Sequence, residues 1–202
     1  MPAIGSICVY CGSQTGRDPA YTQAGQILGR SMAKAGVGLV YGGGAKGVMG
    51  AVAQGVLSEG GHVTGIIPKF LVAKESSQDS LNILSEVILT EDMHERKHLM
   101  FERSDAFVAL PGGIGTLEEI VEIMTWAQLG RHRKPIIFAN VENFWDPVLT
   151  LLDHMRGEGF IHTGRLVQPA VVDDIANVVA TAEAMALRLK EEAMAGDDIA
   201  RM

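Results

Sequence analysis

The segment Leu110–Glu119 combines a glycine-rich turn with two adjacent carboxylates, Glu118 and Glu119. The apolar run Ala106–Leu110 is typical of a buried strand, and Leu117–Leu129 has the spacing of an amphipathic helix. Glycines at such a strand-to-helix turn let backbone N–H groups approach a ligand, and the dipole at a helix N-terminus favours phosphate. The spacing therefore predicts a phosphate-binding turn with two acids beside the molecule that carries the phosphate.

A purely structural explanation accounts for part of the same segment. Thr116 followed by Glu119 fits the capping box, in which the threonine caps the helix and the glutamate bonds back to its N–H group. Taken alone, the segment leaves both explanations open.

A second glycine-rich loop, Gly42–Gly47, follows the apolar run Val37–Tyr41 and resembles the G-x-G-x-x-G pattern of dinucleotide sites. That pattern expects an acidic residue about 20 positions later. Here the next strand ends in Ile66–Pro68, which disfavours NAD. Lys46 precedes a glycine instead of Ser or Thr, so a Walker P-loop is disfavoured too. A tight turn and one wall of a mononucleotide pocket both stay open for this loop.

The run from His94 to His98 reads H-E-x-x-H, the signature of zinc proteases, and Glu118 or Glu119 could supply a third ligand. On a helix the two histidines share one face, whereas Arg96 points about 160° to 200° away from them. A zinc hydrolase is therefore kept only as an alternative hypothesis, and no metal site is expected.

Three charged residues near the expected strand ends are candidates for ligand contacts. Arg96 and Lys97 are either solvated helix charges or groups that bind phosphate and ribose oxygens. Glu75, in the Pro68–Ser80 loop, is either a surface acid or part of a lid over a bound sugar.

Composition narrows the classes of protein. The 202 residues show no linker, which predicts one domain over residues 1–192 and a frayed tail over 193–202. The net charge of −7 and the scattered cations argue against nucleic acid or a membrane surface as a partner. The N-terminus lacks a signal-peptide pattern, so we expect a cytoplasmic protein. Cys8 and Cys11 lie three residues apart on an expected strand and therefore face opposite sides, which disfavours a redox or metal pair.

Apolar runs alternate with helical patterns along the whole chain, which is typical of parallel β-α-β units. The fold class expected is α/β, a doubly wound parallel sheet of Rossmann type, whose ligands bind beyond the carboxyl ends of the strands. The expected strands are Ile4–Tyr10, Val37–Tyr41, His62–Ile67, Glu86–Leu89, Ala106–Leu110 and Pro135–Ala139. The expected helices are Pro19–Ala35, Val48–Ser58, Asp92–Ser104, Thr116–Leu129, Asp146–Arg156 and Asp174–Glu192.

Five motifs together resemble one known family, the LONELY GUY (LOG) family of cytokinin riboside 5'-monophosphate phosphoribohydrolases. The resemblance extends over about residues 6–160. The motifs are Cys8–Ser13, Tyr41–Gly44, Met93–Lys97, Pro111–Glu119 and Thr125–Gly130.

The resemblance implies a Rossmann-type homodimer that hydrolyses the N-glycosidic bond of a nucleoside 5'-monophosphate without a metal or redox cofactor. The products would be the free base and ribose 5-phosphate. Carried over by motif, Arg96 and Glu119 would be the catalytic pair. The phosphate would lie against Gly112, Gly113, Gly115 and Thr116, and further substrate contacts would come from Glu75, Lys97, Glu118 and Thr125.

The implied chemistry agrees with the residue types. Cleavage of a ribosyl bond builds positive charge on the sugar, which a carboxylate such as Glu119 can stabilise. A non-catalytic nucleotide carrier or sensor on the same fold is the alternative of another class. The family has also been labelled lysine decarboxylase, but no lysine is placed to hold pyridoxal phosphate. The sequence leaves open whether the substrate is AMP or a prenylated ribotide, and what role Ser13 has.

Overall fold

The computed structural model describes residues 3–161 and 169–200, and within them seven parallel strands form one sheet. The strand order is β4-β3-β2-β1-β5-β6-β7, so the chain first builds outward from β1 in one direction and then in the other. This is the doubly wound α/β domain that the sequence predicts. The strands are β1 (Ser6–Tyr10), β2 (Gly38–Tyr41), β3 (Val63–Pro68), β4 (Glu86–Thr90), β5 (Ala106–Ala109), β6 (Ile136–Ala139) and β7 (Ala170–Val172).

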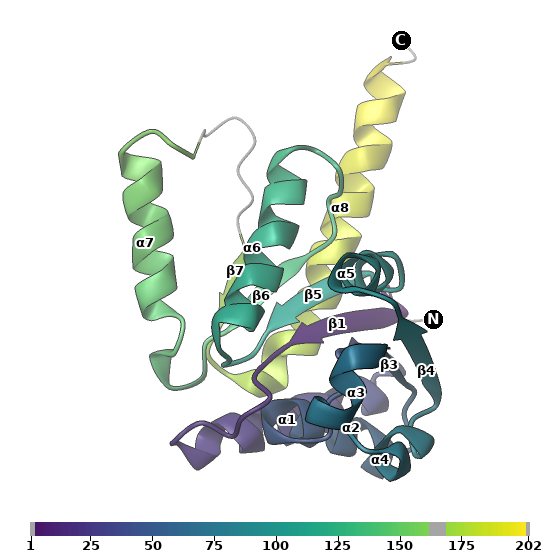
Figure 1. The fold of residues 1–202 in the computed structure, drawn as a ribbon. Coiled ribbons are helices and arrows are strands. Elements are labelled where there is room, and N and C mark those ends of the chain that lie inside the picture. The colour runs from purple at the N-terminus through teal and green to yellow at the C-terminus, as the bar shows by residue number, and fades with distance from the viewer. Residues whose placement is uncertain (1–2, 162–168, 201–202) are drawn as a thin grey trace.

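Helices lie on both sides of the sheet, and the long last helix projects beyond it (Figure 1). Among the described residues no helix is both long and apolar enough to span a membrane. The α-helices are α1 (Pro19–Lys34), α2 (Gly47–Ser58), α3 (Val72–Glu75), α4 (Gln78–Asn82), α5 (Met93–Glu102), α6 (Ile114–Gln128), α7 (Asp146–Gly157) and α8 (Val178–Ala200). The described part of the chain also has three short 3-10 turns, η1 (Lys69–Leu71), η2 (Val141–Asn143) and η4 (Ile175–Asn177).

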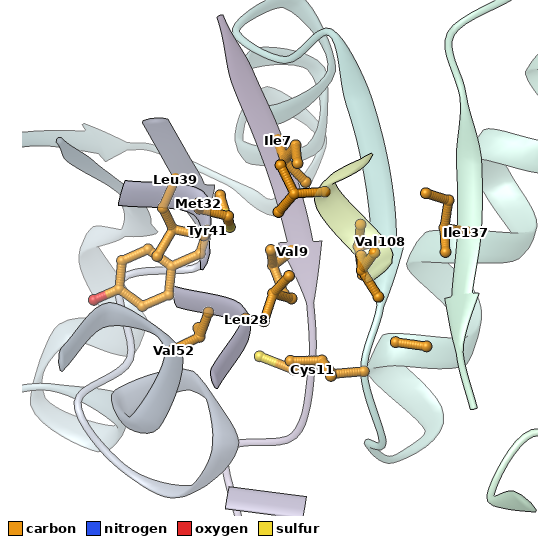
Figure 2. Close-up of a cluster of buried hydrophobic side chains, with 14 of the residues drawn as sticks. Ile7, Val9, Cys11, Leu28, Met32, Leu39, Tyr41, Val52, Val108 and Ile137 are labelled. Carbon is orange, nitrogen blue, oxygen red and sulfur yellow. The ribbon is translucent and has the colours of Figure 1, made fainter. Parts of the chain in front are cut away.

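The two faces of the sheet bury separate apolar cores, because successive side chains of a strand point to opposite faces. Ile7 and Val9 of β1 pack with side chains from α1, α2 and α8, as Figure 2 shows for part of this core. Cys8 and Tyr10 pack with side chains from α5 and α6 on the other face. Cys11 belongs to the first core, so the two cysteines face opposite sides, as predicted, and both are free thiols.

Two features differ from the sequence expectations. Strand β7 was not predicted, because three residues are too few to show an alternating pattern. The segment Pro68–Ser80, expected as a loop, contains η1, α3 and the start of α4. Helix α8 is described as far as Ala200, and the frayed tail expected over residues 193–202 stays a prediction. Residues 201–202 of that expected tail lie outside the described residues.

Helices α1 and α2 approach closely through glycines. A Cβ atom added at Gly29 would lie 2.3 Å from the Val52 oxygen and 2.8 Å from the Val56 nitrogen. Both neighbours are backbone atoms of α2, which cannot move aside as a side chain can. The bare Cα of Gly29 therefore sets the distance between the two helices that cover one face of the sheet.

We expect Gly29→Ala to lower the free energy of unfolding by about 1–3 kcal/mol, because the added methyl group overpacks the α1–α2 contact. Urea unfolding would measure this change. The matched control is Gly157→Ala, since a Cβ atom there meets no atom within 4 Å. An equal loss in both variants would contradict the proposed contact.

Candidate active site

A cavity of about 400 Å³ opens where β1 and β5 end, at the point where the strand order reverses. Ligands of doubly wound sheets bind at this switch point, because the loops that follow the two strands turn in opposite directions. The cavity lining comes from the loops after β1, β2 and β5 and from helices α2, α3, α5 and α6.

The loops after β1 and β5 contact each other beside this cavity through the glycines Gly12 and Gly112. The Gly12 N–H donates to the Pro111 oxygen at 3.1 Å, which joins the loops after β1 and β5. A Cβ atom at Gly112 would lie 2.2 Å from Thr116 Oγ1 and 2.8 Å from the Gly12 nitrogen. Gly112, predicted to contact phosphate, therefore has a packing role and is not among the residues that line the cavity.

Helix α6 begins earlier than the capping-box explanation requires. Its N-cap is Gly113, no side chain of the described residues caps it, and Thr116 already lies buried inside the first turn. The capping box is therefore wrong, because the extended Gly113 lets the helix begin at Ile114 and leaves Glu119 free for other contacts.

The first N–H groups of α6 have no acceptor within their own helix. Gly113 and Gly115 line the cavity, and a Cβ atom at either would meet open space. Together with Thr116, they place a helix N-terminus with two bare Cα atoms at the cavity wall. Such an arrangement binds anions, and phosphate in particular.

A buried guanidinium and a buried carboxylate face each other beside this helix end. Arg96, from α5, is only 6% exposed, and its Nη2 lies 3.9 Å from Glu119 Oε1. That distance is too long for a hydrogen bond. Arg96 Nε has no hydrogen-bond partner among the described residues. Both groups line the cavity, so a ligand between them could bond to both.

The orientation of α5 agrees with the helical spacing. His94 and His98 are exposed on the side away from the cavity, whereas Arg96 points into it. Among the described residues there is no group of three His, Cys, Asp or Glu side chains that could hold a metal ion. The geometry thus gives the zinc alternative no support.

Burial raises the pKa of Glu119 to about 7, although the Arg96 charge partly opposes this shift. The nearby carboxylates of Glu118 and Glu75 raise the pKa further. Glu119 therefore changes its charge near neutral pH. A carboxylate can stabilise a developing positive charge only in its ionised form, which for Glu119 predominates above a pH of about 7.

Lys97 connects the two helices that carry Arg96 and Glu119. Its Nζ lies 2.8 Å from Glu118 Oε1 and 3.0 Å from Glu122 Oε2. These ion pairs raise the pKa of Lys97, although partial burial alone would lower it. Lys97 does not line the cavity, so the structure places this predicted substrate contact in a bridge between α5 and α6.

The other two predicted contacts differ in their placement. Glu75, on α3, lines the cavity, and its buried Oε2 has no hydrogen-bond partner among the described residues. Thr125 is exposed on α6, about 15 Å further along the helix than Gly115. Its hydroxyl donates to the Val121 oxygen at 2.8 Å, and the residue is not part of the cavity lining.

The structure gives the cavity one apolar wall. This wall consists of Met49, Met93, Met100 and Leu71, from α2, α5 and η1. Methionines adapt to flat, apolar ligands. The helical spacing of Met93, Met100, Met124 and Trp126 in the sequence indicates core or interface residues, of which one could line a base pocket, and the structure places Met93 and Met100 in the cavity lining.

The loop Gly42–Gly47 contributes little backbone to the cavity. The first amides of α2, at Val48 and Met49, donate to the Gln14 and Gly12 oxygens and are not free to bind phosphate. Only Gly42 of this loop lines the cavity. The tight-turn explanation therefore accounts for most of the loop.

Comparisons with known proteins agree on a family. A family model described as "Possible lysine decarboxylase" matches residues 49–182. The cytokinin riboside 5'-monophosphate phosphoribohydrolase LOG7 of Arabidopsis thaliana is 48% identical over 155 residues, which cover 77% of this chain and 70% of that protein. The corresponding enzyme LOG of Oryza sativa subsp. japonica is 49% identical over 155 residues, covering 77% and 63%.

Solved structures show the same fold at lower identity. The molybdenum cofactor binding protein from Rippkaea orientalis has a TM-score of 0.66 at 22% identity, over 89% of this chain and 96% of that one. The molybdenum cofactor carrier protein from Chlamydomonas reinhardtii has a TM-score of 0.67 at 19% identity, over the same shares. At these identities the likeness concerns the fold alone.

We expect Glu119 to titrate with a midpoint near 7 in the substrate-free protein, measured by carbon NMR of labelled glutamate side chains. Glu118→Gln and Glu75→Gln should each lower this midpoint, because each removes a negative charge that raises the pKa of Glu119. Glu91→Gln, at an exposed site, is the control and should leave it unchanged. A wild-type midpoint near the ordinary glutamate value of about 4.3 would contradict the burial effect.

Proposed function

Because this chain belongs to the LONELY GUY family of cytokinin riboside 5'-monophosphate phosphoribohydrolases, we propose that it hydrolyses the N-glycosidic bond of nucleoside 5'-monophosphates. One observation of the site carries the proposal. The open N-terminus of α6 lies beside the buried pair Arg96 and Glu119, and all three face one cavity. A sugar phosphate substrate requires an anion site for its phosphate and, for cleavage of its glycosidic bond, a carboxylate next to the sugar.

The 5'-phosphate would bind at the start of α6. The N–H groups of Ile114, Gly115 and Thr116 would donate to its oxygens, and the helix dipole would favour its negative charge. Gly113 and Gly115 would let the phosphate approach the backbone, since no side chain stands in the way. This contact fixes the position of the ribose relative to the acids of the cavity.

Glu119 would act on the sugar. Rupture of the N-glycosidic bond leaves positive charge on the ribose ring, and an ionised carboxylate close to C1' stabilises that charge and orients the attacking water. The bond electrons leave with the base, water supplies the hydroxyl group on C1', and the proton that the water loses ends on the released base. Glu75 would contact the ribose hydroxyls through its unpartnered buried oxygen.

Arg96 would hold the ribose and phosphate oxygens and keep Glu119 ionised when substrate binds, because its charge lowers the pKa of that acid. The base would lie against the wall formed by Met49, Met93, Met100 and Leu71. An apolar wall of this kind suits the N6-prenyl group of a cytokinin ribotide as well as the adenine ring.

The decarboxylase in the family model's description does not fit these residues. Pyridoxal phosphate needs a lysine for its Schiff base, and none of the described residues that line the cavity is a lysine. Lys97, next to Arg96 on α5, is held by Glu118 and Glu122.

We expect Glu119→Gln and Arg96→Ala to lower kcat for release of adenine from AMP, or of isopentenyladenine from its ribotide, by about 100- to 1,000-fold. Each removes an electrostatic contact that strengthens as the bond breaks. Base release followed by chromatography is the measurement. The wild-type kcat/KM should rise with pH through about 7, because Glu119 must lose its proton.

Glu91→Gln is the matched control and should retain wild-type turnover. Nucleosides without the phosphate should be poor substrates, and equal activity on them would contradict the phosphate site. Tight binding of AMP with no base released over long incubation would favour the carrier or sensor alternative. Wild-type turnover in both variants would show that the catalytic pair is wrong.

We also propose that the protein acts as a homodimer through the exposed face of α6. Ile114, Val121, Thr125 and Leu129 follow one another at helical spacing, and all four are exposed. Three of them, Ile114, Val121 and Leu129, are apolar and form an exposed stripe, and contiguous apolar patches of this kind mark interaction sites. Ile114 also lines the cavity, so a second copy on this face would bring its own Thr125 near the substrate.

We expect Leu129→Glu to convert the dimer to monomers, because a carboxylate would be buried without a partner in an apolar interface. Light scattering coupled to size-exclusion chromatography measures the mass. Leu187→Glu on α8 is the control, since this leucine is exposed to a similar degree on another helix. A monomeric wild-type protein would rule the proposal out.

A further inference from the structure

Gly42, the residue that follows β2, has an unusual neighbour. A Cβ atom added there would lie 2.0 Å from Arg96 Nη2 and 3.1 Å from Arg96 Cζ. The guanidinium thus rests directly on the bare Cα of this glycine. Its φ lies outside the range that favours glycine, so the backbone would accept another residue at this position.

From this contact we infer that Gly42 is a positioning residue, whose missing side chain leaves the space in which the Arg96 guanidinium faces Glu119. The inference rests on the proposed function of Arg96. It also gives the glycine-rich loop a purpose other than phosphate binding. The amides that follow the loop donate to backbone oxygens, whereas its first glycine supports the arginine.

Surrounding contacts hold the loop in place, so a methyl group at Gly42 would displace the arginine and not the backbone. A Cβ atom at Gly43 would lie 3.1 Å from Ile67 Cβ, which shows how closely the next residue packs on β3. The Ala45 N–H donates to the Glu75 oxygen at 2.9 Å. In contrast, Arg96 Nη2 is the tip of a long side chain beside an open cavity.

The other side of the guanidinium explains why its position matters. Among the described residues Arg96 Nε has no hydrogen-bond partner, and Nη1 donates to the Met93 sulfur at 3.8 Å. The van der Waals contact with Gly42 therefore limits the position of the guanidinium, a role that hydrogen bonds would otherwise have. Displacement of the tip by about 1 Å changes its geometry toward Glu119 and the sugar, and such a shift costs about 100-fold in rate.

The test combines four variants, Gly42→Ala, Arg96→Ala, the double variant and the control Gly38→Ala. Gly38 is the first residue of β2, the strand that Gly42 follows, and a Cβ atom there would have only ordinary contacts of 3.6 Å or more. We expect Gly42→Ala to lower kcat/KM for base release from AMP about 100-fold. Gly38→Ala should keep the wild-type value, and Gly42→Ala should add no further loss to Arg96→Ala.

A second measurement needs no turnover. The titration midpoint of Glu119, followed by carbon NMR in the substrate-free protein, depends on the Arg96 charge. We expect it to move in Gly42→Ala, to stay in Gly38→Ala, and to be equal in Arg96→Ala and the double variant. This measurement still tests the inference if the protein hydrolyses no nucleotide. Failure of the proposed function can therefore be distinguished from failure of the inference about Gly42.

Three outcomes would overturn the inference. Gly42→Ala could keep both the wild-type rate and the wild-type midpoint of Glu119. Gly42→Ala could lower kcat/KM by the same factor in the presence and in the absence of Arg96, as general structural damage would do. Finally, the urea unfolding midpoint could fall well below that of Gly38→Ala, which would show that the methyl group disturbs the backbone instead of the side chain.

Discussion

A guanidinium and a carboxylate face each other across a buried gap that is too wide for a hydrogen bond, and most of the site is arranged around them. Arg96 Nη2 and Glu119 Oε1 are 3.9 Å apart, and both groups are largely removed from water. Incompletely paired charges in such a place cost several kcal/mol. The Lys97 bridge joins the two helices that carry this pair, and the bare Cα of Gly42 lies against the Arg96 guanidinium.

The sheet supplies the frame for this arrangement. Because the strand order reverses between β1 and β5, the loops after these strands leave a space between them, and the cavity occupies it. The close contact of Gly12 and Gly112 joins the two loops at the base of that space. The start of α6 is thereby fixed against β1, and its free amides face the cavity.

Some of this could be predicted from local rules and some could not. The inward direction of Arg96 and the opposite faces of Cys8 and Cys11 follow from the periods of a helix and a strand. The capping box was wrong because Gly113 offers an earlier helix start, and sequence alone does not rank competing caps. The partners of Lys97 lie on another helix, so no nearby residue in the sequence indicates them.

The short helices between β3 and β4 differ in kind from the rest of the site. They carry Leu71 and Glu75, which line the cavity. Only Leu81 among the residues of η1, α3 and α4 is buried. The Ala45 N–H donates to the Glu75 oxygen and so connects α3 to the Gly42–Gly47 loop. Arg96 and Glu119, in contrast, stand on helices packed against the sheet. The molecule thus separates the packed helices that carry Arg96 and Glu119 from a less buried rim, so substitutions in the rim can change the cavity lining while the geometry of the buried pair is preserved.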